Sequence, residues 1–168
     1  MVSSKIKRNL KHLLTTDGQV SGAFSRSTLS AIEQAIKASE NTHSGEIRFV
    51  VEGALDGMPL FRGQSARERA IEVFSQLRVW DTQDNNGLLI YLLLADRAVE
   101  IVADRGIHGK VNSQEWNKIC QQMQTAFKQS NYESGVLEGL WAVTQQLVQH
   151  FPASGQNGNE LPDQPVLL

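Results

Sequence analysis

The stretch that decides the fold is Gly87-Leu88-Leu89-Ile90-Tyr91-Leu92-Leu93-Leu94. It is apolar without interruption after the glycine, so a strand built from it needs cover on both faces. The short turn Ala95-Asp96-Arg97 leads into residues 98–104, where Val99 and Ile101 alternate with Glu100. Two strands joined so tightly are antiparallel neighbours. The stretch therefore predicts a central antiparallel hairpin in a sheet sandwiched between helices.

Apolar residues at helical spacing predict four helices around this hairpin, over residues 26–40, 65–79, 113–127 and 132–150. The last of them is expected to bury Val136, Leu137, Leu140, Trp141, Thr144, Leu147 and Val148. Residues 46–52 alternate as a strand, with Ile47, Phe49 and Val51 on one face and charged Glu46, Arg48 and Glu52 on the other. The charged face indicates a sheet that is only partly covered there, or an ion pair under a loop. The order of elements predicts an α/β fold with a small mixed sheet and helices on both faces.

The sequence predicts that the chain is divided into three segments. Residues 1–24 form an N-terminal amphipathic helix and a linker that begins at Asp17-Gly18, and residues 25–151 form the α/β domain. Within the domain, residues 53–63 are expected to be a loop. From Ala153 onward Gly, Asn, Gln, Pro and Asp dominate, so residues 152–168 are expected to be a disordered tail that contributes little stability.

Composition excludes several classes of protein. A net charge of -2 and an isoelectric point near 6.1 give no attraction to nucleic acid. Cys120 is the only cysteine, so an intrachain disulfide is excluded, and its place on an apolar helix stripe indicates a core thiol. The four histidines have no recurring metal spacing. Neither a secretory signal nor a run of about 18 apolar residues is found, so we expect a cytoplasmic protein without a transmembrane segment.

Residues 5–14 predict a basic amphipathic helix. Its apolar stripe consists of Ile6, Leu10, Leu13 and Leu14, and its basic residues are Lys5, Lys7, Arg8 and Lys11. Such a stripe usually packs against the parent domain, and we favour that arrangement. The alternative is contact with an anionic membrane surface.

The polar run Asp81-Thr82-Gln83-Asp84-Asn85-Asn86-Gly87 suggests a cation site but does not fit an EF-hand. Placing Asp84, Asn86 and Gly87 on that pattern puts Thr82 first and Leu93 last, where carboxylates are required. A looser oxygen site remains open. The other interpretation is a polar turn whose Asn-Gly supplies a left-handed residue.

Asp104 and the glycines after it form a second candidate ligand-binding site. A carboxylate at a strand end can face a ligand crevice, or it can pair with Arg97 or Arg105 at the surface. Gly106-x-x-Gly109-Lys110 precedes a helix, where backbone N–H groups can bind an anion, although we favour a plain connecting loop. The candidate metal ligands are therefore Asp84, Asn86 and Asp104, and the wider ligand site adds Arg97 and Arg105.

Asn86-Gly87, the aliphatic strand after it, the Asp96-Arg97 turn and Gly106-x-x-Gly109 together resemble the TPM domain. The resemblance extends from about residue 27 to 148. That family takes its name from a thylakoid-lumen phosphatase-like protein, a photosystem II repair protein and an acetylcholine-receptor accessory protein. The resemblance implies a three-layer α/β/α sandwich, a calcium site, and a phosphatase activity proposed for some members.

This chain departs from the family pattern at four positions. Asn85 stands where familiar members carry Asp, Val102 and Asp104 stand where they often carry Glu and Gly, and Ser113 stands where the helix often begins with Asp. Members also commonly have an export signal and a membrane anchor. We expect a cytosolic variant that lacks both.

Two alternative functions are compatible with these sequence features. No complete catalytic constellation can be assembled, which favours a non-catalytic binding or accessory module with an unidentified protein partner. The alternative is a metal-assisted phosphomonoesterase. In it, Asp84, Asn86 and Asp104 hold calcium or another divalent cation, while Arg97 or Arg105 holds the phosphate.

Overall fold

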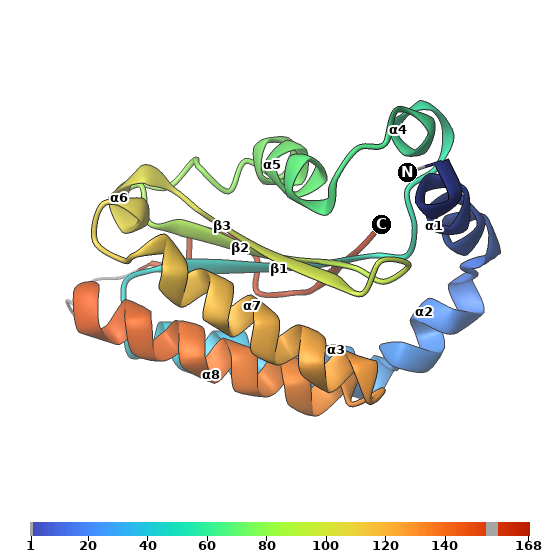
Figure 1. Ribbon diagram of the computed structural model, residues 1–168. Helices are drawn as coiled ribbons and strands as arrows, with labels where there is room; N and C mark the ends of the chain where they lie inside the picture. The colour runs from blue at the N-terminus through green and yellow to red at the C-terminus, as the bar shows by residue number, and fades with distance from the viewer. Residues whose placement is uncertain (1, 154–157) are drawn as a thin grey trace.

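A four-stranded mixed sheet forms the centre of the molecule (Figure 1). The computed structural model describes residues 2–153 and 158–168. The strands are β1 (Glu46–Glu52), β2 (Gly87–Leu93), β3 (Ala98–Ala103) and β4 (Val166–Leu167), in the order β3-β2-β1-β4. β2 runs parallel to β1 and antiparallel to β3, with Ile90 opposite both Phe49 and Ile101. The hairpin predicted from the sequence is therefore confirmed, with β3 at the edge of the sheet.

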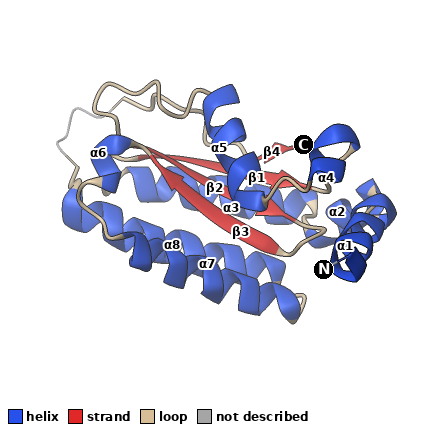
Figure 2. Cartoon of the chain, turned by 45° about the horizontal axis from the view of Figure 1, so that its top comes forward, coloured by secondary structure: helices blue, strands red, loops and turns tan. Residues whose placement is uncertain are grey.

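Helices cover both faces of this sheet, which confirms the three-layer α/β/α prediction (Figures 1 and 2). One layer is α3 (Arg26–Glu40), α7 (Ser113–Lys128) and α8 (Tyr132–His150), and the other is built around α5 (Ala66–Gln76). Along β2, Leu88, Ile90 and Leu92 belong to the first core, while Leu89, Tyr91 and Leu93 belong to the second. All seven residues of β2 are buried, as a doubly covered strand requires.

Close packing of α7 and α8 determines which face of α8 is buried. A Cβ on Gly135 would lie 2.7 Å from the Cβ of Ala126, so only glycine lets the two helices approach this closely. Gly139 makes an equally close approach to Met123. The predicted buried stripe is correct for Val136, Leu140 and Leu147 but wrong for Trp141 and Val148, which are exposed; Leu137 and Thr144 are half-buried. Val143 is buried instead, because the small residues rotate the contact face away from Trp141.

Two segments expected to be irregular are helical. The expected linker from Asp17 is α2 (Asp17–Ala23), and its N-cap residue Thr16 donates its backbone N–H to Gln19 Oε1 at 3.3 Å. The expected loop over residues 53–63 contains α4 (Gly57–Arg62), which tolerates Pro59 in its first turn. A short helix, α6 (Arg105–His108), also follows β3. Among the described helices, none combines the length and the apolarity needed to cross a bilayer.

The C-terminal tail is the largest departure from the sequence prediction. Val166 and Leu167 pair in parallel with Val50 and Val51, so the tail ends as a strand of the sheet and Leu161 is buried in the α5 core. The expectation of a disordered tail is wrong for residues 158–168, and residues 154–157 lie outside the described part of the chain. The tail docks because it offers hydrogen-bonding partners to the charged face of β1.

Three charged side chains of β1 are buried, and backbone groups of the tail form hydrogen bonds with two of them. Glu46 accepts hydrogen bonds from the backbone N–H groups of Glu160 (3.2 Å) and Leu161 (3.0 Å). Arg48 donates to the carbonyl oxygens of Pro162 and Gln164. Glu52 forms an ion pair with Arg69, which lies on helix α5 and not on a loop as expected. All seven residues of β1 are buried, so the alternative of a partly covered sheet is wrong.

Candidate functional site

The polar run before β2 folds into a tight turn held by its own side chains. The backbone N–H of Asn86 donates to Thr82 Oγ1 at 3.1 Å, and the Asn86 amide donates to the carbonyl oxygen of Ser44. Asn85 adopts a left-handed conformation with a φ of 51°, which asparagine tolerates better than most residues. This turn places Asn86 inside the protein and leaves Asp84 exposed on the same loop.

A second loop, after β3, lies directly against the first. The backbone N–H of Asp104 donates to the carbonyl oxygen of Gly87 at 2.9 Å, and that of Gly106 donates to Asn85 at 3.0 Å. A Cβ on Gly106 would lie 2.5 Å from the carbonyl oxygen of Asn85, so this contact requires glycine. Arg105 Nε adds a 3.1 Å hydrogen bond to Asn85 Oδ1. The structure therefore brings Asp84, Asn86, Asp104 and Arg105 into two adjoining loops, which we call the paired loops (residues 81–87 and 104–109).

Two buried oxygen atoms in the paired loops accept no hydrogen bond within the described part of the chain. They are Asn86 Oδ1 and Asp104 Oδ2, on residues that are only 2% and 9% exposed. The other oxygen of Asp104, Oδ1, accepts the Arg105 backbone N–H at 2.7 Å as the N-cap of α6. Buried acceptors without a donor are costly, by about 1–3 kcal/mol each, and native proteins rarely leave them so. Each of the two oxygens marks a place where a cation or a hydrogen-bond donor would be stabilised.

These oxygens are suited in type to a hard cation. Calcium takes carboxylate, amide and backbone carbonyl oxygens, which the paired loops offer through Asp104, Asn86 and the carbonyl of Asp84 beside Gly106. Among the described residues, no group of three His, Cys, Asp or Glu side chains lies close enough together to hold a metal ion. Any cation here would complete its coordination with water.

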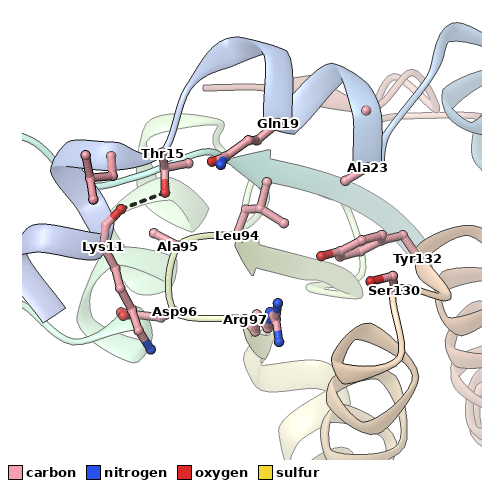
Figure 3. Close-up of a pocket in the computed structure, with 12 residues that line it drawn as sticks. Lys11, Thr15, Gln19, Ala23, Leu94, Ala95, Asp96, Arg97, Ser130 and Tyr132 are labelled. Atoms are coloured by element: carbon pink, nitrogen blue, oxygen red, sulfur yellow. Dashed lines mark hydrogen bonds between the residues drawn. The ribbon is translucent and has the colours of Figure 1, made fainter. Parts of the chain in front are cut away.

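Arg97, the remaining candidate, lies at the opposite end of the sheet. It occupies the turn between β2 and β3 with a φ of 51°, beyond the carboxyl ends of the parallel strands β1 and β2. There it lines a cavity of about 760 Å³ together with Lys11, Asp96, Ser130 and Tyr132 (Figure 3). The predicted set of ligand residues is thus divided between two ends of the molecule. Arg97 is not near the paired loops.

The cavity at the Arg97 end could not be found from local patterns. Its wall is formed by α1 (Val2–Leu14) and α2, and α1 is held there by Asp96. Arg8 Nη2 lies 2.8 Å from Asp96 Oδ2, and His12 Nε2 lies 3.1 Å from Asp96 Oδ1. These contacts join residues more than 80 positions apart, which no helical or strand periodicity encodes.

Two further groups singled out in the sequence have structural roles. The ammonium of Lys110 lies 4.1 Å above the ring centroid of Phe151 and 3.4 Å from the carbonyl oxygen of His150, so the loop docks on the end of α8. Burial raises the pKa of the Cys120 thiol to about 12, which keeps it protonated and unreactive near neutral pH.

Comparison with known proteins gives a consistent result. The family model for the TPM domain matches residues 19–146. The BA42 protein of the psychrophilic bacterium Bizionia argentinensis, solved by NMR, is 29% identical with a TM-score of 0.76, over 86% of this chain and 95% of that one. The N-terminal domain of a protein from P. gingivalis shares the fold, with a TM-score of 0.61 and 24% identity over 79% of this chain and 83% of that one. No curated protein sequence matches significantly.

Proposed function

Because the chain belongs to the TPM domain family, we propose that it is a non-catalytic binding module of that type, whose paired loops hold a divalent cation. The observation that carries the proposal is the pair of buried acceptors, Asn86 Oδ1 and Asp104 Oδ2. Asp104, Asn86 and the exposed Asp84 would be the cation ligands. Calcium fits these oxygens best, because it accepts flexible geometry and several water ligands.

A cation in this place would link the two loops. Asp104 follows β3 and Asn86 precedes β2, so one ion bound to both would tie the two strand ends together from outside the sheet. Neutralising a nearly buried carboxylate would also remove the cost of leaving it unpaired. The resulting rigid surface would be the part presented to a protein partner.

Apart from Asn86 Oδ1 and Asp104 Oδ2, the side chains that shape the paired loops are engaged in holding the loops together, which supports binding rather than catalysis. The Thr82 hydroxyl accepts the Asn86 N–H, Asp104 Oδ1 caps α6, and Arg105 Nε is bound to Asn85. A nucleophile or general base must be free to exchange a proton with a substrate. The alternative of a metal-assisted phosphomonoesterase retains Arg105 as its phosphate-binding group, since Arg97 lies at the other end.

Thermal unfolding with and without calcium tests the proposal. A cation bound only to the folded protein stabilises it by RT ln(1 + [L]/Kd), or about 2.7 kcal/mol at a hundredfold excess over Kd. Calcium is expected to raise the melting temperature of the wild type, with the increment lost in Asp104→Asn and reduced in Asp84→Asn. Asp56→Asn is the matched control, because Asp56 is exposed and its side chain caps nothing.

Hydrolysis of p-nitrophenyl phosphate separates the two functions. The binding module is expected to show no turnover with calcium, magnesium or manganese. Turnover that disappears in both Asp104→Asn and Arg105→Gln would instead establish the phosphomonoesterase.

A further inference from the structure

The N-terminal helix α1 is attached to the domain by its polar side, with its apolar side facing outward. Ile6, Leu10, Leu13 and Leu14 are between 54% and 66% exposed, whereas His12 is buried. The expectation that the apolar stripe packs against the parent domain is therefore wrong. A soluble helix normally buries such a stripe, so the inverted arrangement needs another explanation.

Specific contacts hold α1 in this orientation. Arg8 Nε lies 2.9 Å from Asp96 Oδ2, and Arg8 Nη2 donates to the carbonyl oxygen of Gln64 at 2.8 Å. The backbone N–H of Leu55 donates to His12 Nδ1 at 2.9 Å. Because Arg8 and His12 are one turn apart, they fix the rotation of the helix about its axis as well as its position. These contacts therefore determine that the apolar stripe of α1 faces outward.

A second helix enlarges the apolar surface. α4 lies beside α1, at the same end of the molecule in both ribbon views (Figures 1 and 2). On it Met58 and Phe61 are 57% and 65% exposed. We call the surface made by the four apolar residues of α1 with Met58 and Phe61 the outer face.

Basic residues accompany the outer face. Four of the 16 Lys and Arg residues, and none of the 18 Asp and Glu residues, precede Asp17. Lys5, Lys7 and Lys11 are exposed beside the stripe, and none of the ion pairs among the described residues includes them. The rest of the chain is correspondingly acidic, so positive charge is concentrated where the apolar side chains are exposed.

We propose that the outer face binds the surface of an anionic lipid bilayer, with α1 lying flat in the headgroup region. Leucine, isoleucine and phenylalanine side chains would enter the acyl boundary, while the lysines remain among anionic headgroups. α1 has 13 residues, too few to span the hydrocarbon core but sufficient for an interfacial helix. A second copy of the chain is a poorer occupant, because two stripes packed together would bring the lysines of two acid-free helices into one interface.

Co-sedimentation with vesicles tests this proposal on the full chain. Vesicles of phosphatidylcholine with about a third phosphatidylglycerol are expected to bind the protein, and phosphatidylcholine alone to bind it weakly. Binding to the anionic vesicles is expected to fall as salt rises, because screening weakens the attraction of the lysines. Leu10→Gln/Leu13→Gln is expected to weaken binding by roughly tenfold or more, and Lys5→Gln/Lys7→Gln to reduce mainly the preference for anionic lipid.

The control variant is Trp141→Gln, which removes an equally exposed apolar side chain from α8, away from the outer face. It is expected to bind vesicles as the wild type does. All variants change exposed side chains, and circular dichroism melting checks that they fold. The proposal is overturned if anionic vesicles do not bind the wild type, or if Leu10→Gln/Leu13→Gln binds them unchanged. It is also overturned if sedimentation equilibrium shows a dimer that this double variant dissociates, since the outer face would then be occupied by a second copy.

Discussion

The guanidinium of Arg69 on α5 contacts the carboxylate of Glu52 on β1 through three hydrogen bonds of 2.9 to 3.2 Å. The Tyr91 hydroxyl on β2 donates a further hydrogen bond of 2.5 Å to the same carboxylate. The Glu52 hydrogen bonds raise the pKa of Arg69, and burial raises the pKa of Tyr91. A charged residue at the end of β1 is thereby made compatible with a fully covered strand.

Removing one partner of this pair should destabilise the protein strongly. Arg69→Met leaves Glu52 nearly buried without its countercharge, and breaking such a pair costs about 3–5 kcal/mol. Urea unfolding measures the loss. In the Arg69→Met background, the further change Glu52→Gln should cost little or restore stability, because the unpaired charge is gone. Strict additivity of the two single changes would contradict this account of the pair.

The free energy of unfolding should fall as pH rises above neutrality, because Glu40 has a raised pKa in the folded protein. Burial, opposed by a hydrogen bond from the Ile47 N–H and reinforced by Glu46 and Asp163, raises the pKa of Glu40 from 4.5 to about 8. Between these two values the folded state binds more protons than the unfolded state, so stability decreases with pH. Burial lowers the pKa of His43 from 6.5 to about 4, which makes stability rise with pH only below 6.5. Above that value the Glu40 effect is unopposed by His43.

Melting temperatures measured from pH 6.5 to about pH 9 check this prediction. Glu40→Gln keeps an oxygen that accepts the Ile47 N–H but removes the titration, so it should flatten the fall. An unchanged slope in Glu40→Gln would show that another group is responsible.

Both faces of β2 should be sensitive to truncation. Leu89 packs in the α5 core and Ile90 in the core of α3, α7 and α8, and both are fully buried. Leu89→Ala and Ile90→Ala should each cost about 2–5 kcal/mol in denaturant unfolding. Ile71→Ala on the exposed side of α5 is the control and should be nearly neutral. A neutral Leu89→Ala would mean that α5 and the tail do not cover the sheet.

Deleting residues 153–168 should lower the melting temperature by several degrees. The deletion removes β4 and Leu161, and it leaves Glu46 and Arg48 without the backbone groups that bind them. Two buried charges would then be unsatisfied, each at a cost above that of a neutral group. Differential scanning calorimetry measures the change. If the truncated chain melts with the full-length protein, the docked tail contributes nothing to the folded state.

The features that the sequence predicted well are those encoded by local periodicity. The uninterrupted apolar run predicted the covered strand β2, and the short Asp96-Arg97 turn predicted an antiparallel partner. The bounds of α3 and α8 agree with the apolar spacing, because a cap or proline ends each pattern. α2 could also have been found, since Thr16 and Gln19 have the spacing of a capping box.

The features that the sequence missed depend on contacts between distant segments. The tail is polar and looks unable to fold, yet its backbone groups satisfy Glu46 and Arg48 across more than 110 residues. The orientation of α1 depends on Asp96, which lies 88 residues from Arg8. The separation of Arg97 from Asp84, Asn86, Asp104 and Arg105 could have been predicted, because the predicted hairpin places its turn one strand length away from them.

A calcium titration followed by ¹⁵N–¹H NMR tests the proposed cation site most directly, because it reports each backbone amide separately. Saturable shifts with a single dissociation constant are expected for the amides of Asn86, Gly87, Arg105 and Gly106, and they should be absent in Asp104→Asn. The chemical shifts of the amides around Arg97 and in α1 should not change. Shifts that are absent, that grow linearly with calcium, or that fall on exposed carboxylates elsewhere would contradict the site and the binding function built on it.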